Sequence, residues 1–308
     1  MTKLDERLAR GDILILDGAT GTEIERRGAP MDSQAWSATA NLTHPEVVRS
    51  VHEDYLRAGV DILIANTFSA ARCHLEPAGL GDRVAAVNRR AVEIALAARD
   101  HAAGGREVWV AGSMSTMAPG NDPARRPPAA RMTEMLREQA DLLAGAGVDL
   151  IVLEMMLDVD YASGAVDAAR ATGLPVWVGF SCRRDDRGVV YTWRSIRDDL
   201  PFAEVVGPVM ARGASLLAVM HTEVNDTGPA LEVAKRHWPG PLGAYPESGS
   251  FKMPNWQFVD VIAPENFLAQ AEAWVRQGVQ VVGGCCGLGP VHIRLLRERL
   301  PTRLPQAR

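Results

Sequence analysis

The chain has 308 residues, of which 47% are hydrophobic, and this is enough to bury a large core in one or two domains. Its net charge of −5 gives no reason to expect nucleic acid or an anionic membrane as a partner. Four cysteines do not make a disulfide framework, and the sequence lacks both an apolar leader and a long apolar run. These features predict a soluble protein of a reducing compartment, the cytoplasm.

Short apolar runs alternate with longer amphipathic ones along the whole chain, and eight such pairs are found. The apolar runs are rich in Val, Ile and Leu with little alternation, as expected for strands that are covered on both faces. Strands are predicted at 13–17, 60–66, 108–113, 148–154, 175–181, 216–221, 241–245 and 279–284. Helices are predicted at 45–58, 83–99, 130–146, 158–171, 202–212, 228–237, 264–276 and 290–299. The pattern predicts the α/β class, with one (β/α)₈ TIM barrel as a single domain over residues 1–308.

The predicted strands end in polar residues although the strands themselves are apolar. Barrel enzymes place their chemistry at the C-terminal ends of the strands, so these ends predict a site. Polar residues also cap strands for ordinary hydrogen-bonding reasons, and the prediction therefore depends on the whole set. In chain order the set is Asp17, Asn66, Thr67, Ser113, Glu154, Ser181, Cys182, His221, Tyr245, Cys285 and Cys286.

Two adjacent cysteines, Cys285 and Cys286, follow the last predicted strand and are flanked by glycines. Neighbouring cysteines are poor candidates for a disulfide with each other, and the glycines allow a sharp turn that can point both sulfurs at one place. Two converging thiolates favour a soft-metal site, with Zn²⁺ as the default ion. The alternative is a pair of buried cysteines that pack as small apolar residues.

His221 ends the sixth predicted strand, two places from the eighth around a barrel, so it can face Cys285 and Cys286. One His and two Cys form a known zinc set with an open fourth position, and we expect His221 to be the third ligand. The alternative is a core histidine bonded to a backbone carbonyl. The solitary Cys73 and Cys182 are interpreted as structural.

Glu154 and Asp17 each end an apolar strand, where an unpaired carboxylate is expensive to bury. Each is either paired with an arginine or is the counter-charge for a substrate ammonium group. The turn that begins at Gly18 offers backbone N–H groups to an anion such as a carboxylate. Trp36 and Tyr245 are candidates for aromatic residues that bind a cation.

Several phrases of the sequence resemble the homocysteine S-methyltransferase family over nearly the whole chain and in the same order. The most specific is Gly283-Gly284-Cys285-Cys286-Gly287; the others lie at 16–22, 36–37, 65–68, 147–154 and 245–249. The resemblance implies a (β/α)₈ barrel with one catalytic zinc that binds the homocysteine thiolate. Family donors include S-methylmethionine, betaine and methyl-corrinoid. It also implies that Cys285 and Cys286 bind zinc and that Asp17 and Glu154 hold the acceptor's ammonium group.

The sequence departs from the family at four positions around this site. The family's third ligand is a cysteine after an asparagine, and here His221 follows Met220. Tyr161 replaces an acidic residue, and Glu247 replaces the asparagine of a Tyr-Pro-Asn-Ser-Gly phrase. With His221 the zinc site is neutral instead of carrying one negative charge, so it should bind an added thiolate more firmly but leave it less nucleophilic. A metal other than zinc is also compatible with an imidazole ligand.

The sequence thus predicts a zinc-dependent methyltransferase that moves a methyl group from a small sulfonium or ammonium donor, or from a carrier, to a thiol, with homocysteine as the leading acceptor. Gly18, Trp36, Asn66, Tyr245 and Glu247 are predicted to bind substrate together with the two carboxylates. A metal-dependent hydrolase or lyase that uses Glu154 or Glu247 as base is one alternative. A non-catalytic relative that binds an amino acid or a metal is another. Whether the chain forms a homo-oligomer stays open.

Overall fold

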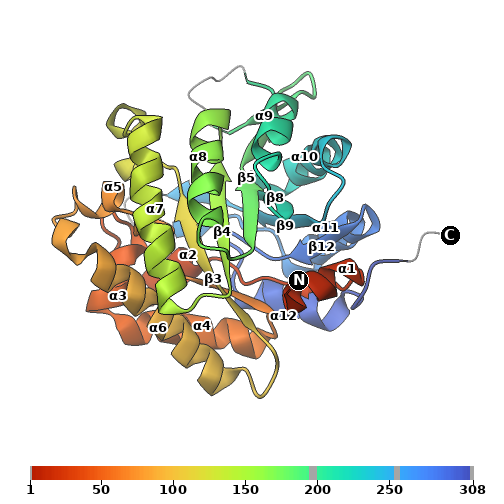
Figure 1. Cartoon of the computed structure of the whole chain (residues 1–308). Helices are drawn as coiled ribbons and strands as arrows, with labels where there is room; N and C mark the ends of the chain where they lie inside the picture. Colours follow the sequence, from red (N-terminus) through yellow and green to blue (C-terminus); the bar gives the residue numbers. More distant parts are fainter. Residues whose placement is uncertain (1, 194–199, 253–256, 306–308) are drawn as a thin grey trace.

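The fold is seen in a computed structural model, which describes residues 2–193, 200–252 and 257–305. Eight parallel strands form one sheet in the order β1-β12-β9-β8-β5-β4-β3-β2 (Figure 1). A parallel bridge between Leu16 and Ile62 connects the end of β1 to β2, so the sheet closes on itself. The strands are β1 (Leu14–Ile15), β2 (Ile62–Ala65), β3 (Trp109–Ser115), β4 (Leu150–Met156), β5 (Val176–Phe180), β8 (Leu216–Glu223), β9 (Leu242–Glu247) and β12 (Val279–Val282). The predicted barrel is confirmed.

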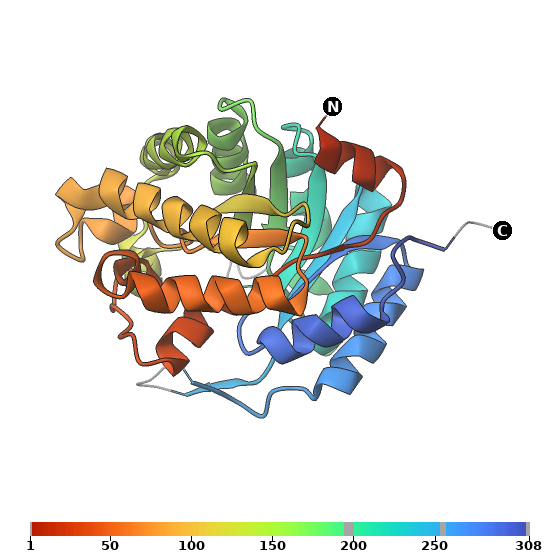
Figure 2. The same cartoon turned by 90° about the horizontal axis from the view of Figure 1, so that it is seen from below.

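Helices surround the strands, and the first and last of the large ones, α4 and α12, lie side by side (Figure 2). The helices that follow strands are α2 (Thr20–Arg26), α3 (Ala40–Thr43), α4 (Pro45–Ala58), α5 (Arg72–Leu75), α6 (Val84–Ala102), α7 (Ala129–Ala146), α8 (Val159–Arg170), α9 (Phe202–Met210), α10 (Val224–His237), α11 (Pro264–Arg276) and α12 (Pro290–Arg299). No helix of the described chain is long and apolar enough to cross a membrane.

Prolines and glycines set several of these boundaries. Helices α4, α11 and α12 start at a proline and have the bounds that the sequence predicts. Gly59 ends α4 in the left-handed conformation, with φ of 98°. Helix α10 starts earlier than predicted, at Val224, because it continues through Pro229.

An unpredicted helix, α1 (Lys3–Ala9), lies at the N-terminal end of the barrel. Its Leu4 and Leu8 belong to the same buried cluster as the inward-facing side chains of the strands. Helix α1 thus fills the strand interior from this end, and the cavity described below lies at the opposite, C-terminal end. Two further hairpins follow β5 and β9: β6 (Cys182–Arg184) with β7 (Val190–Thr192), and β10 (Ser250–Lys252) with β11 (Gln257–Val259).

Paired charges tie the N-terminal end together. Asp12 accepts hydrogen bonds from Arg7, Arg10 and Arg303, at 3.0, 3.1 and 3.0 Å. Asp61 accepts the backbone N–H of Ile15 at 2.8 Å and is paired with Arg7 and with Arg297. These pairs connect α1, β1, α12 and the C-terminal segment.

Candidate active site

The loop after β12 holds Cys285 and Cys286 at the C-terminal end of the barrel. The N–H of Cys285 donates to the Pro246 carbonyl at 2.7 Å, and the Cys286 carbonyl accepts the N–H of Ser248 at 3.0 Å. Gly287 has φ of 81°, and a Cβ there would lie 2.1 Å from the Ser248 carbonyl oxygen. The glycine therefore allows the turn that brings both sulfurs to one side, 3.9 Å apart.

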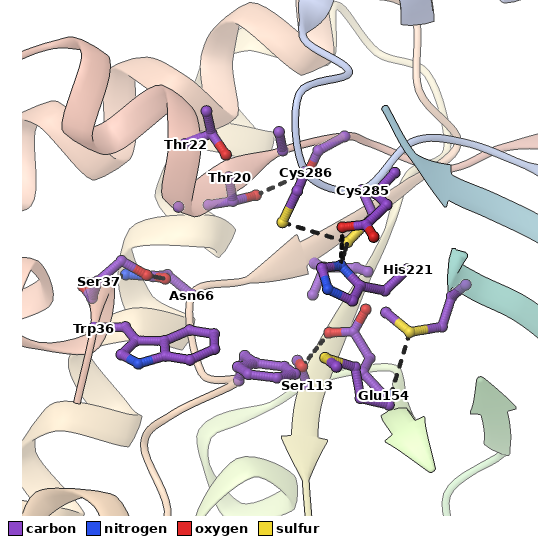
Figure 3. A pocket seen from close by; sticks show the side chains of 18 of the residues that line it. Thr20, Thr22, Trp36, Ser37, Asn66, Ser113, Glu154, His221, Cys285 and Cys286 are labelled. Carbon is purple, nitrogen blue, oxygen red and sulfur yellow. Dashed lines mark hydrogen bonds and ion pairs between the residues drawn. The ribbon is translucent and has the colours of Figure 1, made fainter. Parts of the chain in front are cut away.

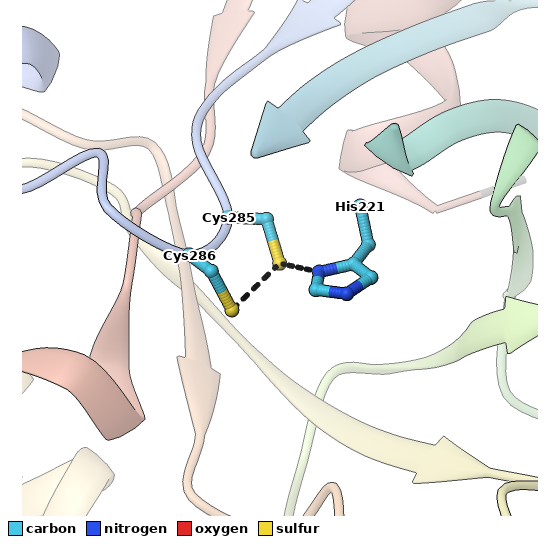
Figure 4. Close-up of side chains that lie close together, drawn as sticks. All are labelled: His221, Cys285 and Cys286. Carbon is cyan, nitrogen blue, oxygen red and sulfur yellow. Dashed lines mark hydrogen bonds between the residues drawn. The ribbon is translucent and has the colours of Figure 1, made fainter. Parts of the chain in front are cut away.

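His221, Cys285 and Cys286 come together as the sequence predicts (Figure 4). The Nδ1 atom of His221 lies 3.5 Å from the Cys285 sulfur, and the ligand atoms of all three residues lie within 4.8 Å of one another. A tetrahedral zinc with ordinary bond lengths needs about 3.8 Å between two sulfurs and about 3.6 Å between sulfur and nitrogen. The observed separations fit such an ion.

Two β-bulges aim the functional side chains into the barrel mouth. The register of β4 against β5 shifts between Leu153 and Met156, and that of β8 against β9 shifts between Met220 and Glu223. Glu154 lies in the first bulge and His221 in the second. A bulge turns a side chain away from its regular direction, which is why these two residues reach the site.

The mouth of the barrel forms a cavity of about 290 Å³ (Figure 3). The described chain has five residues other than glycine with positive φ, and four of these line the cavity: Trp36, Asn121, Met155 and His221. Such backbone conformations cost free energy and collect at functional sites. The concentration of strain supports the placement of the site here.

The two carboxylates predicted at the strand ends are both buried beside this cavity. Asp17 is 1% exposed, and one of its oxygens accepts the N–H of Ile64 at 2.8 Å. Glu154 is 7% exposed and accepts a hydrogen bond from the Ser113 hydroxyl. Neither forms an ion pair with lysine or arginine in the described chain, and no lysine or arginine lines the cavity there. The alternative of an arginine pair is thus not what the structure shows.

Burial without a cation changes the acidity of both groups. Burial raises the pKa of Glu154 to about 7, although Ser113 and His221 act in the opposite direction. Burial raises the pKa of Asp17 well above its usual range; the Ile64 N–H lowers it only in part, and the charge of Glu154 adds to the rise. Both sites therefore favour a ligand that brings a positive charge.

The pKa values of two metal-ligand candidates, His221 and Cys285, are also shifted. Burial would lower the pKa of His221, but Cys285, Glu247 and Glu154 raise it to about 9. Contact with Cys286, together with burial, raises the pKa of the Cys285 thiol well above its usual range. A metal that binds here has to displace these protons, so binding will depend on pH.

Trp36 lies across the cavity from His221 and stacks on Phe68, with ring centres 5.5 Å apart (Figure 3). The backbone of Trp36 is strained, with φ of 48°, and the next residue, Ser37, is fixed by Asn66. The Asn66 side chain accepts from the Ser37 hydroxyl at 2.7 Å and donates to the Ser37 carbonyl at 2.8 Å and to Asn41 at 3.0 Å. Asn66 thus lines the cavity, but its amide group is engaged with the protein.

Of three other predicted substrate-binding residues, Glu247 and Gly18 line the cavity and Tyr245 does not. Glu247 lines the cavity and has an oxygen 3.1 Å from His221 Nδ1. Gly18 lines the cavity, and a Cβ there would lie 2.2 Å from the Leu288 carbonyl oxygen. Tyr245 is buried and is not among the described residues that line the cavity. Tyr161, one of the departures from the family, lies under the guanidinium of Arg126, 3.5 Å from its ring centre, and does not line the cavity.

Apart from Trp36, sequence reasoning missed the thioether and aromatic part of the wall. Trp193 lies edge-on to His221, with ring centres 5.3 Å apart, and comes from a segment with no predicted element. Nothing in the sequence around Trp193 signals this role. The place of Met155 in the cavity wall was not predicted, because it depends on the bulge in β4. The apolar lining consists of Met31, Trp36, Ile64, Phe68, Met117, Met155, Trp193, Met220 and Phe258.

Comparisons with known proteins agree with this geometry. The family model described as homocysteine S-methyltransferase matches residues 14–300. The chain is 29% identical to a selenocysteine Se-methyltransferase of Brassica oleracea var. italica over 95% of this chain and 90% of that protein. It is 27% identical to betaine–homocysteine S-methyltransferase 1 of Danio rerio over 98% of this chain and 77% of that protein.

Among solved structures, the metallated form of the homocysteine methyltransferase MmuM from Escherichia coli superposes with a TM-score of 0.78. It has 26% identity and covers 97% of this chain and 100% of that chain. The family match covers both strand-end carboxylates and the complete Gly-Gly-Cys-Cys-Gly turn. The chain belongs to the homocysteine S-methyltransferase family.

Proposed function

We propose that this S-methyltransferase uses one zinc ion, held by His221, Cys285 and Cys286, to methylate a thiol amino acid, with homocysteine as the leading acceptor. The observation that carries the proposal is the spacing of the three ligand atoms, which suits a tetrahedral ion beside two buried carboxylates. The free vicinal thiols fit a reducing compartment, the cytoplasm.

Zinc would supply Lewis acidity that lowers the pKa of a thiol bound to it. Asp17 and Glu154 would hold the ammonium group of the acceptor. An ammonium placed between them would lower their raised pKa values and leave both as carboxylates, so the substrate provides the cation that the protein does not. The two carboxylates fix one end of the acceptor, and this orients its sulfur toward the cavity.

The aromatic part of the cavity wall fits a small cationic methyl donor. Trp36, Phe68 and Trp193 present aromatic surfaces, which attract a sulfonium or ammonium group. The acceptor thiolate attacks the methyl carbon, a new S–C bond forms, and the bond between carbon and the onium atom breaks. The bond's electron pair stays with the departing atom, and the donor leaves without its positive charge.

The proposal is tested by metal analysis followed by an acceptor screen. Purified protein should contain about one zinc per chain and should transfer a labelled methyl group to homocysteine from at least one of S-methylmethionine, betaine or a methylated carrier. Cys285→Ala should lose most of the metal and the activity. Cys182→Ala, a buried cysteine outside the cavity, is the matched control and should keep both. Full metal retention in Cys285→Ala would refute the ligand assignment.

A further inference from the structure

A hydrogen bond to sulfur links two strands that are not neighbours in the barrel. The backbone N–H of Met155 in β4 donates to the Sδ atom of Met220 in β8 at 3.2 Å. Strand β5 lies between these two strands in the sheet. The two residues are 3% and 1% exposed, so the bond is shielded from water. A buried N–H without an acceptor is costly, and Met220 removes that cost.

A glycine in β5 gives the Met220 side chain its path. Gly179 pairs with Ala218 of β8, and a Cβ at Gly179 would lie 2.5 Å from the Tyr245 hydroxyl oxygen, 2.7 Å from Met220 Cγ and 3.2 Å from the Leu153 carbonyl oxygen. Any larger residue at position 179 would therefore displace the Met220 thioether from its contact with β4. The contact between β8 and β4 therefore depends on two residues. Met220 provides the sulfur that reaches β4, and Gly179 leaves space for its side chain.

The bond joins the two bulges that aim the functional side chains. Met155 follows Glu154 inside the β4 bulge, where its φ is 55° and regular pairing with β5 is interrupted. Met220 directly precedes His221, whose φ is 41°, at the β8 bulge. The sulfur of Met220 thus holds the segment of Glu154 at a fixed distance from the segment of His221.

We propose that Met220 is a positioning residue that sets the distance between the carboxylate for the acceptor's ammonium group and the metal that binds its thiol. This inference rests on the proposed function. An acceptor amino acid has to span from Glu154 to the metal, so the tie selects the number of carbons between ammonium and sulfur. It also explains what the methionine does at a position where the family has asparagine: it provides an acceptor for the Met155 N–H.

The test compares Met220→Leu, which keeps the shape and removes the acceptor, with Met220→Gln, which keeps an acceptor at similar reach. In Met220→Leu the KM for homocysteine should rise about tenfold, with zinc content unchanged. The KM for 4-sulfanylbutanoate, which lacks the ammonium group, should change less than about twofold. The preference for homocysteine over the shorter cysteine should shrink, and Met220→Gln should restore most of both effects.

A second readout needs neither metal nor substrate. Hydrogen exchange of the peptide that covers residues 150–157 should be faster in Met220→Leu than in wild type. Met210→Leu, a buried methionine of helix α9 outside the cavity, is the matched control and should leave that exchange unchanged.

Unchanged exchange together with an unchanged homocysteine KM in Met220→Leu would overturn the inference. Equal losses for homocysteine and 4-sulfanylbutanoate would overturn it as well, because the defect would then not concern the ammonium end. If the wild type methylates no thiol, the proposed function fails, while the exchange experiment still decides whether the tie exists.

Discussion

Asp12 and Asp17 lie at opposite ends of strand β1, and their pKa values are shifted in opposite directions. Burial alone would raise the pKa of Asp12, but hydrogen bonds from Arg7, Arg10 and Arg303 outweigh it and hold that pKa below its usual value. Burial raises the pKa of Asp17, where backbone N–H groups such as that of Ile64 take the place of an arginine. The same side chain is stabilised as an anion at one end of the barrel and destabilised at the other.

The difference extends to the whole of each end. At the N-terminal end the buried acids are matched by arginines, and α1 fills the interior. At the C-terminal end Asp17 and Glu154 have no lysine or arginine partner among the described residues, two strands carry bulges, and four of the five positive-φ residues other than glycine in the described chain line the cavity. Ion pairs stabilise the fold at the N-terminal end. At the C-terminal end, strained backbone and uncompensated carboxylates lower stability, and a bound ligand can offset that cost.

The largest effect on stability is expected at Asp61. Asp61→Asn removes the charge that pairs with Arg297 and Arg7, and we expect the free energy of unfolding to fall by about 2–4 kcal/mol. Methyl transfer should keep its kcat/KM at temperatures where the variant is folded. Urea unfolding of the metal-free protein measures the first quantity and the acceptor assay the second.

Asp100→Asn is the control for that experiment, because Asp100 is paired with Arg99 but is largely exposed. Its unfolding free energy should change by less than about 0.5 kcal/mol. If Asp61→Asn lowered kcat/KM as strongly as a substitution in the cavity, the two ends of the barrel would not be functionally separate.

At the other end, Asp17→Asn and Glu154→Gln should each weaken acceptor binding by about 1.5–3 kcal/mol, since each removes a charged hydrogen bond to the ammonium group. Neither substitution should lower stability, because each removes a buried carboxylate that has no cation. Titration calorimetry with homocysteine gives the affinity, and urea unfolding gives the stability. Unchanged affinity in both variants would mean that the acceptor carries no ammonium there.

The third prediction concerns pH. Asp12 has a lowered folded pKa, so its stabilisation is present above about pH 4 and is lost as the pH falls through that folded value. Asp17 has a raised folded pKa, so the folded state loses stability as the pH rises above about 4 toward that value. Unfolding free energies from pH 4 to 8 should therefore show the wild type losing stability relative to Asp17→Asn as the pH rises.

Relative to Asp12→Asn, the wild type should keep a constant advantage over the same range. Parallel curves for all three proteins would contradict the assignment of opposite acidities to the two ends of β1.

The smallest predicted effect is at His221. His221→Cys should still bind zinc, since three thiolates and a water form a sound tetrahedral site. The added negative charge should raise the apparent pKa of the acceptor thiol, by about one unit, and make its sulfur more nucleophilic. Metal content and the pH–rate profiles of wild type, His221→Cys and His221→Ala measure this. Three identical profiles would show that His221 does not tune the metal.

The sequence was sufficient for the architecture because each barrel strand is a short apolar run and several helices have their own boundary signals. Proline starts α4, α11 and α12, and the predicted bounds agree with the structure for this local reason. The small hairpin β6–β7 was not predicted, because short strands outside the main sheet have no apolar period of their own. Helix α1 was not predicted because it has few apolar residues. Their burial depends on contact with the barrel interior, which the local sequence does not show.

For the site, residue type and strand position were enough to bring His221, Cys285 and Cys286 together. They were not enough for Tyr161, which lies against Arg126 and outside the cavity. The bulge that exposes Met155 is a property of register between strands, and register is not visible in one strand's sequence. Departures such as Met220 can be noticed in the sequence, but their contacts come only from the fold.

Strand β12 has a consequence for how the protein is made. It lies between β1 and β9 in the sheet, with Leu14 opposite Val281. The barrel therefore cannot close on β1 until β12 is in place. Cys285 and Cys286 follow that same strand. A nascent chain therefore acquires both thiols only together with the strand that closes the sheet. A metal held by these thiols would depend on barrel closure, and chains interrupted before β12 will have neither the closed sheet nor the two thiols.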